Sequence, residues 1–416
     1  HEFTRHQLTP SNTTLNGAWN QIFAVIGAAN SVIDSFESSP QAENLKAEIA
    51  EVRAMRAYAY FFAMDLFGNV PIFTESRVDP QNLPSTNQRT EVFDFIVSEL
   101  EGAISDLPSI TEVNRTEYYP RYTKESGYAI LAITFLNGEV YTGNEYWDEA
   151  IAMSDNIINS GGYILEPEFI SSFTTNNHNS QELIAAASID PAQNAGNNVY
   201  LRGASHPRHQ ITYDLPFTPA NGYKSFFTAV ERYEDEDVRK QYMVYGLQYD
   251  GEGNPLTVSD NDDTHLELVP IVDYQSVAHN EGARVLKYIP DGNWVGRSSS
   301  NDIPFIRYSE ILLTKAEALY RSPEGSNSEA LALLNEVRTR SNATELSEIS
   351  LEIIENERAR EFIWEGQRRR DMIRFGSYFT GTWKFKTEET PEYRGIYPIP
   401  QNQIQGNDNL IQNPGY

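Results

Sequence analysis

Cysteine is entirely absent from this chain of 416 residues. Its absence excludes disulfide bridges, thiolate metal sites and cysteine nucleophiles. Long apolar runs are missing too, because the longest falls far short of the roughly 18 residues that a membrane-spanning helix needs. Hydrophobic residues still make up 40% of the chain. We therefore expect a folded protein with a large core, arranged as one big domain or as two to three units.

Positive charge is scarce. The chain carries 32 lysines and arginines against 59 aspartates and glutamates, for a formal net charge of −27. A surface this negative repels nucleic acid and anionic lipid headgroups. The composition thus excludes a nucleic-acid binder. The opening "HEFTRHQLTP" has no apolar stretch, which indicates a start that has been processed or trimmed.

Catalytic motifs are lacking as well. The chain contains no G-x-S-x-G, H-E-x-x-H, Walker loop or G-x-G-x-x-G. His206 and His209 are three residues apart, but Pro207 breaks the helix that would align them, so we read them as surface histidines. We predict no catalytic residue and no metal site.

Calcium is the one cofactor for which the sequence offers candidate ligands, in two acidic turns. "DGEGN" (250–254) and "DNDD" (260–263) have calcium-like acid spacing. Neither has a glutamate at the twelfth position of its loop, so solvated acidic turns are the simpler interpretation.

Helical periodicity dominates the N-terminal third. Apolar stripes with a 3.6-residue period predict helices over 17–33 and 42–68, and a third that begins at Thr90 as its N-cap. Helix pairs are predicted at 123–143 with 146–160 and at 305–321 with 328–341, and a last long helix over 350–375. Each pair has alanine where two helices must approach closely, as in tetratricopeptide-like hairpins.

The remaining segments are not helical in pattern. Over 162–303, Gly, Pro, Asn and Asp recur every few residues, which predicts long structured loops and short strands. The C-terminal segment contains Pro398, Pro400 and Pro414, so we expect an extended strap that cannot be helical.

An arginine-rich segment stands out against this acidic background. Residues 355–374 hold six arginines together with five acids. Glu365 precedes Arg369 by four and Asp371 precedes Arg374 by three, spacings at which charges meet on a helix. We predict arginine–carboxylate pairs that clamp this helix to its neighbours, rather than an anion site.

The same segment carries a family resemblance. "IENERAREFIWEGQRRRDMIRFG" (354–376) resembles the signature of the RagB/SusD family. Further blocks at 51–73, 121–141, 301–319 and 396–416 are similar to that family in the same order. The family's lipidated N-terminal cysteine is not in this sequence.

The resemblance implies an all-α fold and a single SusD-like unit over 1–416. Its parts would be N-terminal helices with the first tetratricopeptide-like pair (4–161), a loop-rich ligand lobe (162–303), later tetratricopeptide-like helices (304–376) and an extended C-terminal strap (377–416).

The resemblance also implies a function. Such proteins are not enzymes. They bind polysaccharide or oligosaccharide at the extracellular face of the outer membrane, held by an N-terminal lipid anchor, and pass it to a SusC-like TonB-dependent transporter. With −27 charges, a neutral glycan such as a β-glucan is favoured. A tetratricopeptide-type protein-binding scaffold and a helical-barrel glycoside hydrolase remain as alternatives.

Candidate ligand contacts are aromatic residues in loops, because sugar C–H faces stack on aromatic rings. Trp19, Trp147 and Trp364 fall on predicted helices, so we assign them to the core. The residues that we expect to contact a ligand are Trp294 first, then Tyr223, Asn221, Tyr213, Tyr200 and Trp383.

Overall fold

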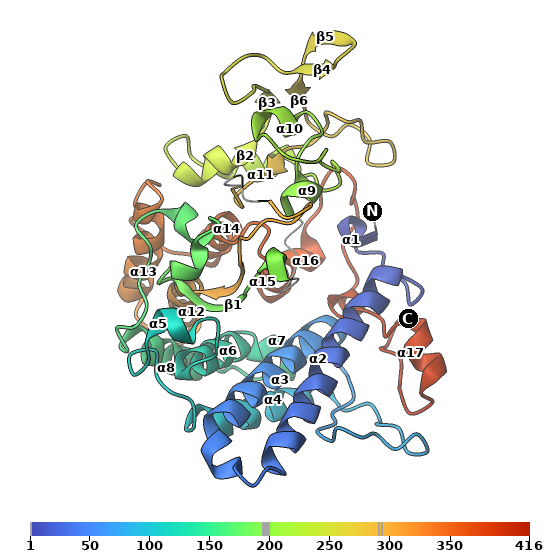
Figure 1. Cartoon of the computed structure of the whole chain (residues 1–416), viewed down its shortest axis with the longest axis vertical. Helices are drawn as coiled ribbons and strands as arrows, with labels where there is room; N and C mark the ends of the chain where they lie inside the picture. Colours follow the sequence, from blue (N-terminus) through green and yellow to red (C-terminus); the bar gives the residue numbers. More distant parts are fainter. Residues whose placement is uncertain (1, 194–199, 290–291, 293) are drawn as a thin grey trace. The chain divides into compact units, whose positions relative to one another are not determined.

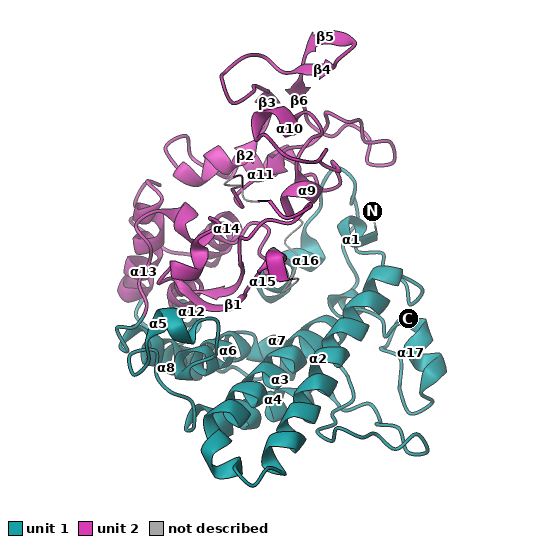
Figure 2. Cartoon of the chain, in the orientation of Figure 1, with its two compact units in different colours: residues 1–162, 317–326, 369–416 teal, residues 163–316, 327–368 magenta. Residues whose placement is uncertain are grey.

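The computed structural model describes residues 2–193, 200–289, 292 and 294–416 (Figure 1). Contacts divide the chain into two compact units, each assembled from separate stretches of sequence (Figure 2). Unit 1 comprises residues 1–162, 317–326 and 369–416, and unit 2 comprises residues 163–316 and 327–368. Residues 290, 291 and 293, which belong to the predicted loop around Trp294, lie outside the described part.

Unit 1 is helical. Its elements are α1 (Glu2–Arg5), α2 (Thr13–Glu37), α3 (Lys46–Phe67), α4 (Arg89–Ile104), α5 (Arg115–Tyr118), α6 (Lys124–Leu136), α7 (Gly138–Thr142), α8 (Trp147–Ile158), α16 (Ser377–Thr380) and α17 (Gln401–Gly406), with most of α15 (Arg368–Phe375). Helix α3 packs against α2 and α4, and α6 packs against α8. Helix α6 also packs closely against α4. Gly127 allows this contact, because an added Cβ there would lie 2.6 Å from Ile104 of α4. The predicted tetratricopeptide-like helix pair over 123–143 and 146–160 is therefore present, since α6 packs against α8.

Local signals set most helix ends in unit 1. Asn12 caps α2 by accepting a hydrogen bond from the Leu15 amide, and Gly68 ends α3 with φ +68°. Helix α4 begins at Arg89 with Gln88 as its cap, two residues before the predicted cap Thr90, which lies inside the helix. The predicted helix over 123–143 is interrupted at Asn137, whose side-chain amide donates to the Ile133 carbonyl.

The C-terminal strap corrects one prediction. Most of it is non-helical, but Ser377–Thr380 forms α16 and Gln401–Gly406 forms helix α17. Pro400 stands at the N-cap with φ −58°, where a proline costs no intrahelical hydrogen bond. The statement that this segment cannot be helical is therefore wrong, because a proline excludes the helix before it and not the helix after it.

Unit 2 combines short strands and helices. Its strands are β1 (Leu183–Ala187), β2 (Met243–Val244), β3 (Gly246–Leu247), β4 (Thr257–Ser259), β5 (Asp262–His265), β6 (Glu267–Leu268), β7 (Arg284–Val285) and β8 (Ile303–Arg307). They pair antiparallel, as β1–β8, β2–β7, β3–β6 and β4–β5. Its helices are α9 (Tyr200–Ala204), α10 (His209–Thr212), α11 (Phe227–Val230), the first part of α12 (Tyr308–Arg321), α13 (Asn327–Arg340) and α14 (Leu351–Glu361). Short strands and structured loops thus occupy the stretch where they were predicted.

Two predicted helices differ from the structure in unit 2. Residues 305–307 belong to strand β8 and pair with β1, so α12 begins only at Tyr308. The predicted helix over 350–375 is broken, because α14 ends at Glu361 and α15 begins at Arg368. Within the break Trp364 and Gly366 have φ of +61° and +84°, which no right-handed helix accommodates.

Buried arginine–carboxylate pairs hold unit 2 together, as the sequence predicted. Glu361 accepts from Arg307 (3.0 Å), Arg239 (2.8 Å) and Arg340 (2.5 Å), and every one of these side chains is at most 3% exposed. Glu357 accepts in turn from Arg239. Multiple guanidinium–carboxylate contacts offset the cost of burying each charge.

Arg369 pairs with an acid of a neighbouring helix, as predicted for this segment, but its pairing with Glu365 was wrong. In unit 1 Arg369 contacts Asp65 (3.4 Å) and lies 4.2 Å from the ring centroid of Tyr397. The pair at 371 and 374 is confirmed: Arg374 contacts Asp371 at 2.8 Å and also binds Glu317 through two nitrogens. Glu365 could not pair through helical spacing because the helix is interrupted between 361 and 368.

Within the described residues, no helix is long and apolar enough to cross a bilayer.

Candidate functional site

A buried cluster in unit 2 gathers the aromatic residues that the sequence singled out. Its buried members are Leu201, Ala204, Leu215, Phe217 and Leu286. Tyr200, Tyr213, Trp294 and Trp364 pack on it while remaining partly exposed. Three of the predicted contact residues therefore surround one core, together with a tryptophan that was not predicted.

Tyr223 extends this group toward solvent. Its side chain is 53% exposed, and its ring meets that of Trp364 at 5.5 Å between centroids and 69° between planes. The ring also lies against Gly203, where an added Cβ would be 2.3 Å away. We call Tyr200, Tyr213, Tyr223, Trp294 and Trp364 the aromatic site.

The loop that carries Tyr223 is fastened to the end of α9. The amides of Gly222 and Tyr223 both donate to the Gly203 carbonyl, at 2.8 and 3.0 Å, and the Asn221 amide donates to the Ser205 carbonyl. These bonds satisfy carbonyl groups that a helix end leaves open. An exposed tyrosine is thus presented from a backbone that is fixed at several points.

Asn221 holds this loop through its side chain. It has φ +55°, its Oδ1 accepts from Arg284 at 2.6 Å and 3.2 Å, and its Nδ2 donates to the His279 carbonyl at 2.9 Å. Its carboxamide oxygen is therefore engaged inside the protein. Any direct contact between Asn221 and a ligand would come from its second amide hydrogen.

Trp364 is the functional candidate that sequence reasoning missed. It stands between Tyr200 (5.2 Å, 86°) and Tyr223, and its indole nitrogen donates to the Ser225 hydroxyl at 3.1 Å. The regular charge spacing suggested a continuous helix and hence a core position. Gly366, two residues later, was the available signal that the helix stops there.

Trp294 packs edge-on against Phe217, with ring centroids 5.1 Å apart. Its indole nitrogen is buried and finds no hydrogen-bond partner within the described residues, although buried tryptophan N–H groups usually have one. The residues that follow it, Val295 to Arg297, are exposed.

Burial keeps the hydroxyl groups of Tyr200 and Tyr213 protonated, because it raises the pKa of each. Burial, followed by the neighbouring Tyr288 and Glu365, raises the pKa of Tyr200 well above its usual value. Burial raises the pKa of Tyr213 to about 12. The Tyr200 hydroxyl donates to the Val285 carbonyl at 3.0 Å.

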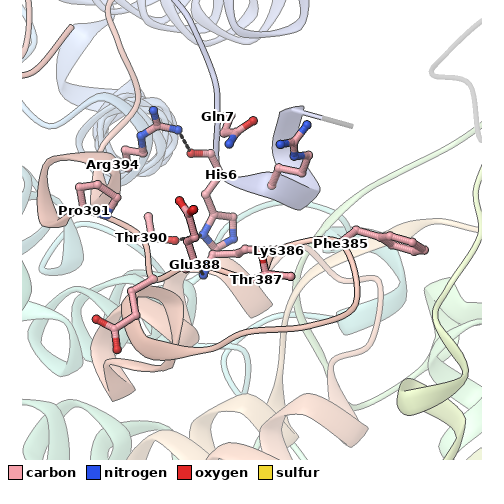
Figure 3. A pocket seen from close by; sticks show the side chains of 11 residues that line it. His6, Gln7, Phe385, Lys386, Thr387, Glu388, Thr390, Pro391 and Arg394 are labelled. Carbon is pink, nitrogen blue, oxygen red and sulfur yellow. Dashed lines mark hydrogen bonds between the residues drawn. The ribbon is translucent and has the colours of Figure 1, made fainter. Parts of the chain in front are cut away.

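Trp383 belongs to unit 1, apart from the residues above. Its ring meets His6 edge-on at 5.2 Å, and the Lys386 amine lies 4.8 Å from its centroid. His6 and Lys386 also line a cavity of about 270 Å³ between the start of the chain and the strap (Figure 3). There the Arg394 guanidinium donates to the His6 carbonyl, and His6 Nδ1 lies 2.8 Å from the Thr390 hydroxyl.

His206 and His209 are buried, so their interpretation as surface histidines was wrong. His209 Nε2 lies 3.0 Å from Gln248 Oε1, and His209 Nδ1 accepts from the His206 amide. Burial lowers the pKa of His206 to about 3 and that of His209 to about 4. Among the described residues no three potential ligands gather into a metal-binding cluster.

These histidines predict a pH dependence of stability. In the unfolded chain both histidines take up a proton near pH 6.5, whereas in the folded chain they do so only near pH 3 to 4. The free energy of unfolding therefore falls as the pH drops from about 6.5 toward these folded-state pKa values. Each proton contributes a slope of up to about 1.4 kcal/mol per pH unit. In urea titrations between pH 7.5 and 4.5, His206→Gln/His209→Gln should show a shallower slope than the parent protein. His178→Gln, at an exposed position, is the control, and equal slopes for all three proteins would contradict the prediction.

The geometry defines a class of protein: a tetratricopeptide-like helical scaffold that presents a fixed aromatic surface from a loop-rich unit. Comparison with known proteins then gives the family. Residues 129–416 match the model of the SusD family, and residues 1–136 match a model described as starch-binding and associating with the outer membrane. This chain belongs to the SusD family.

Individual relatives agree with this assignment. The starch-binding protein SusD of Bacteroides thetaiotaomicron is 27% identical over 458 residues, which cover the whole chain and 81% of that protein. A SusD-like protein of Bacteroides ovatus is 24% identical and covers 92% of the chain and 71% of its own length. Surface glycan-binding protein A of Bacteroides thetaiotaomicron, solved with laminarihexaose, shares the fold with a TM-score of 0.80 at 23% identity, covering 99% of this chain and 88% of that one.

Proposed function

We propose that this protein captures polysaccharide or oligosaccharide at the cell surface and does not chemically alter it. The observation that carries the proposal is the aromatic site, where an exposed Tyr223 is fixed on Gly203 and Trp364. Aromatic surface held in place suits the C–H faces of sugar rings and loses little side-chain entropy on binding. Membership of the SusD family, together with the starch-binding and glycan-binding relatives, supports the same function.

Native affinity electrophoresis through gels with a panel of polysaccharides tests the proposal. We expect slower migration in at least one gel and no release of reducing sugar from that polymer on prolonged incubation. Release of reducing sugar would favour a glycoside hydrolase, and unchanged migration in every gel would favour a protein-binding scaffold. Either result would overturn the proposal.

A neutral glycan, such as a β-glucan, is the ligand class that we favour. The net charge is −27, and two buried cations that support the aromatic site are already engaged: Arg284 by Asn221 and carbonyl groups, Lys287 by Glu365. We expect laminarin-type polymers to retard the protein more than alginate or pectin fragments. Tight binding of a uronate polymer that weakens steeply with added salt would contradict this prediction.

Location and partner follow from the family in the same proposal. The protein would be anchored by lipid at the extracellular face of the outer membrane and would deliver its glycan to a TonB-dependent, SusC-like transporter. The family model that matches residues 1–136 is described as associating with the outer membrane, which supports this location. Co-purification of a barrel transporter from detergent-solubilised membranes is the expected result, and a native population without any such partner would contradict it.

A further inference from the structure

One short segment of unit 2, residues 284–288, contacts the supports of the aromatic site at several points. Its Arg284 side chain holds Asn221, and its Val285 carbonyl accepts from the Tyr200 hydroxyl. Leu286 is a member of the buried cluster on which the site packs. The Tyr288 ring lies 4.7 Å from that of Tyr200.

Arg284 is buried without a carboxylate partner among the described residues. Its Nε and Nη2 donate to Asn221 Oδ1, and its remaining hydrogens reach the carbonyls of His279, Glu281 and Gly282. All five of its donors are therefore used, and burial lowers its pKa to about 10. In the described part of the chain, only neutral oxygens surround this buried guanidinium. Its hydrogen bonds fix the positions of the groups around it, but burying its charge without a carboxylate costs free energy.

Lys287 makes the second connection. Its amine is fully buried and lies 2.7 Å from Glu365 Oε1. Arg307 binds the same carboxylate at both oxygens, through Nη2 and Nε at 2.8 Å each. Glu365 is the neighbour of Trp364, which has φ +61°, a conformation that costs a non-glycine residue free energy unless its surroundings impose it.

Further bonds fasten the far side of the same break. The Glu365 amide donates to the Phe362 carbonyl at 3.0 Å, and the Gln367 side-chain amide donates to Glu310 at 2.9 Å. The side chains of Glu365 and Gln367, which follow Trp364, are thus tied to buried polar partners, while the Trp364 ring remains partly exposed between Tyr200 and Tyr223.

We propose that Arg284 and Lys287 are positioning residues of the aromatic site: Arg284 sets Tyr223 through Asn221, and Lys287 sets Trp364 through Glu365. Both side chains are inaccessible, so neither touches a ligand. The proposal rests on the proposed function, since it concerns the glycan affinity of that same site. It deepens that function by naming two residues whose effect on affinity must pass through another side chain.

The first test removes the Lys287–Glu365 pair with its charges balanced. Lys287→Met/Glu365→Gln should fold, because Arg307 keeps Glu182 and Glu361 as partners. Its affinity for the best polysaccharide of the panel, measured by calorimetric titration, should fall at least fivefold. Adding Trp364→Ala to this variant should weaken binding no further than Trp364→Ala does alone, because both changes act on one ring.

A spectroscopic readout separates positioning from general loosening. The tryptophan emission of Lys287→Met/Glu365→Gln should differ from that of the parent protein, and this difference should vanish when both proteins carry Trp364→Phe. Lys315→Met/Glu329→Gln is the control, since it removes a lysine–glutamate pair between α12 and α13 at 2.5 Å, and neither residue belongs to the aromatic site. It should leave the affinity unchanged.

The second test concerns Arg284. Arg284→Met should reduce affinity about as much as Asn221→Ala, and the effects of the two changes on affinity should not add when they are combined.

A conservative variant covers the case in which Lys287→Met/Glu365→Gln does not fold. Lys287→Gln keeps a hydrogen-bond donor opposite Glu365, so it should retain more affinity than Lys287→Met.

The outcomes distinguish this inference from the function on which it rests. If Trp364→Ala and Tyr223→Ala weaken binding while Arg284→Met and Lys287→Met/Glu365→Gln fold with parental affinity, the positioning roles are overturned and the proposed site stands. If Trp364→Ala and Tyr223→Ala both keep parental affinity, the aromatic site itself is overturned, and the positioning roles with it.

Discussion

Glu361→Gln is expected to lower the free energy of unfolding by about 3–5 kcal/mol, because it removes a buried carboxylate that three buried guanidinium groups share. Glu361 accepts from Arg307, Arg239 and Arg340 at 2.5 to 3.0 Å, and its side chain is inaccessible. Burial alone would raise the pKa of Glu361, but the three guanidiniums hold it well below its usual value. A glutamine fits the same space yet cannot balance three cations.

Chemical denaturation at pH 7 measures this effect. Glu352→Gln is a matched control, since Glu352 is an exposed residue in the first turn of the same helix α14. The control should change stability by less than about 0.5 kcal/mol. If Glu361→Gln unfolds at the same denaturant concentration as the control, the charge network does not stabilise unit 2 as we describe.

Trp294→Ala is expected to reduce the affinity for the best glycan of the panel at least tenfold. Stacking contributes roughly 0.5–1.5 kcal/mol beyond the apolar area that the ligand covers, and the area adds to it. Trp294 is only partly buried, packs edge-on against Phe217, and has a buried N–H group with no partner among the described residues.

Calorimetric titration together with a melting curve decides between a ligand contact and a structural role for Trp294. Trp294→Phe should retain part of the affinity, since it keeps an aromatic face. Tyr249→Ala is the control: Tyr249 is 45% exposed in the same unit and lies outside the aromatic site, so its loss should not matter. Unchanged affinity with a markedly lower melting temperature in Trp294→Ala would make Trp294 a filler between loop and core.

Several parts of the fold were readable from the sequence because their causes are local. Apolar stripes placed α2, α3 and α4, and α3 ends at Phe67, next to the predicted end at 68. The density of Gly, Pro, Asn and Asp over 162–303 predicted short strands and loops in what is now unit 2. An arginine-rich segment with nearly as many acids predicted internal ion pairs, and Arg374 with Asp371 follows that rule.

The assembly of the aromatic site was not readable in this way. Loop position alone suggested Tyr200, Tyr213, Tyr223 and Trp294, but nothing in the sequence brings them around one buried cluster. Trp364 was assigned to a helix because its neighbours obey helical spacing. The buried histidines were misplaced for a related reason, since a polar residue beside a proline gives no sign of what will cover it.

The sequence by itself therefore determined the helical scaffold and the pairing of the arginine-rich segment with acids, because apolar stripes and charge spacing are local signals, and it determined the family through blocks that recur in order along the chain. Tertiary structure alone decided which acid each arginine meets and where the last helix breaks. Glu365 follows Lys287 by 78 residues and Arg307 by 58. Local periodicity cannot predict contacts between residues so far apart in the sequence. Yet these bonds hold Glu365 directly after the turn that places Trp364 between Tyr200 and Tyr223.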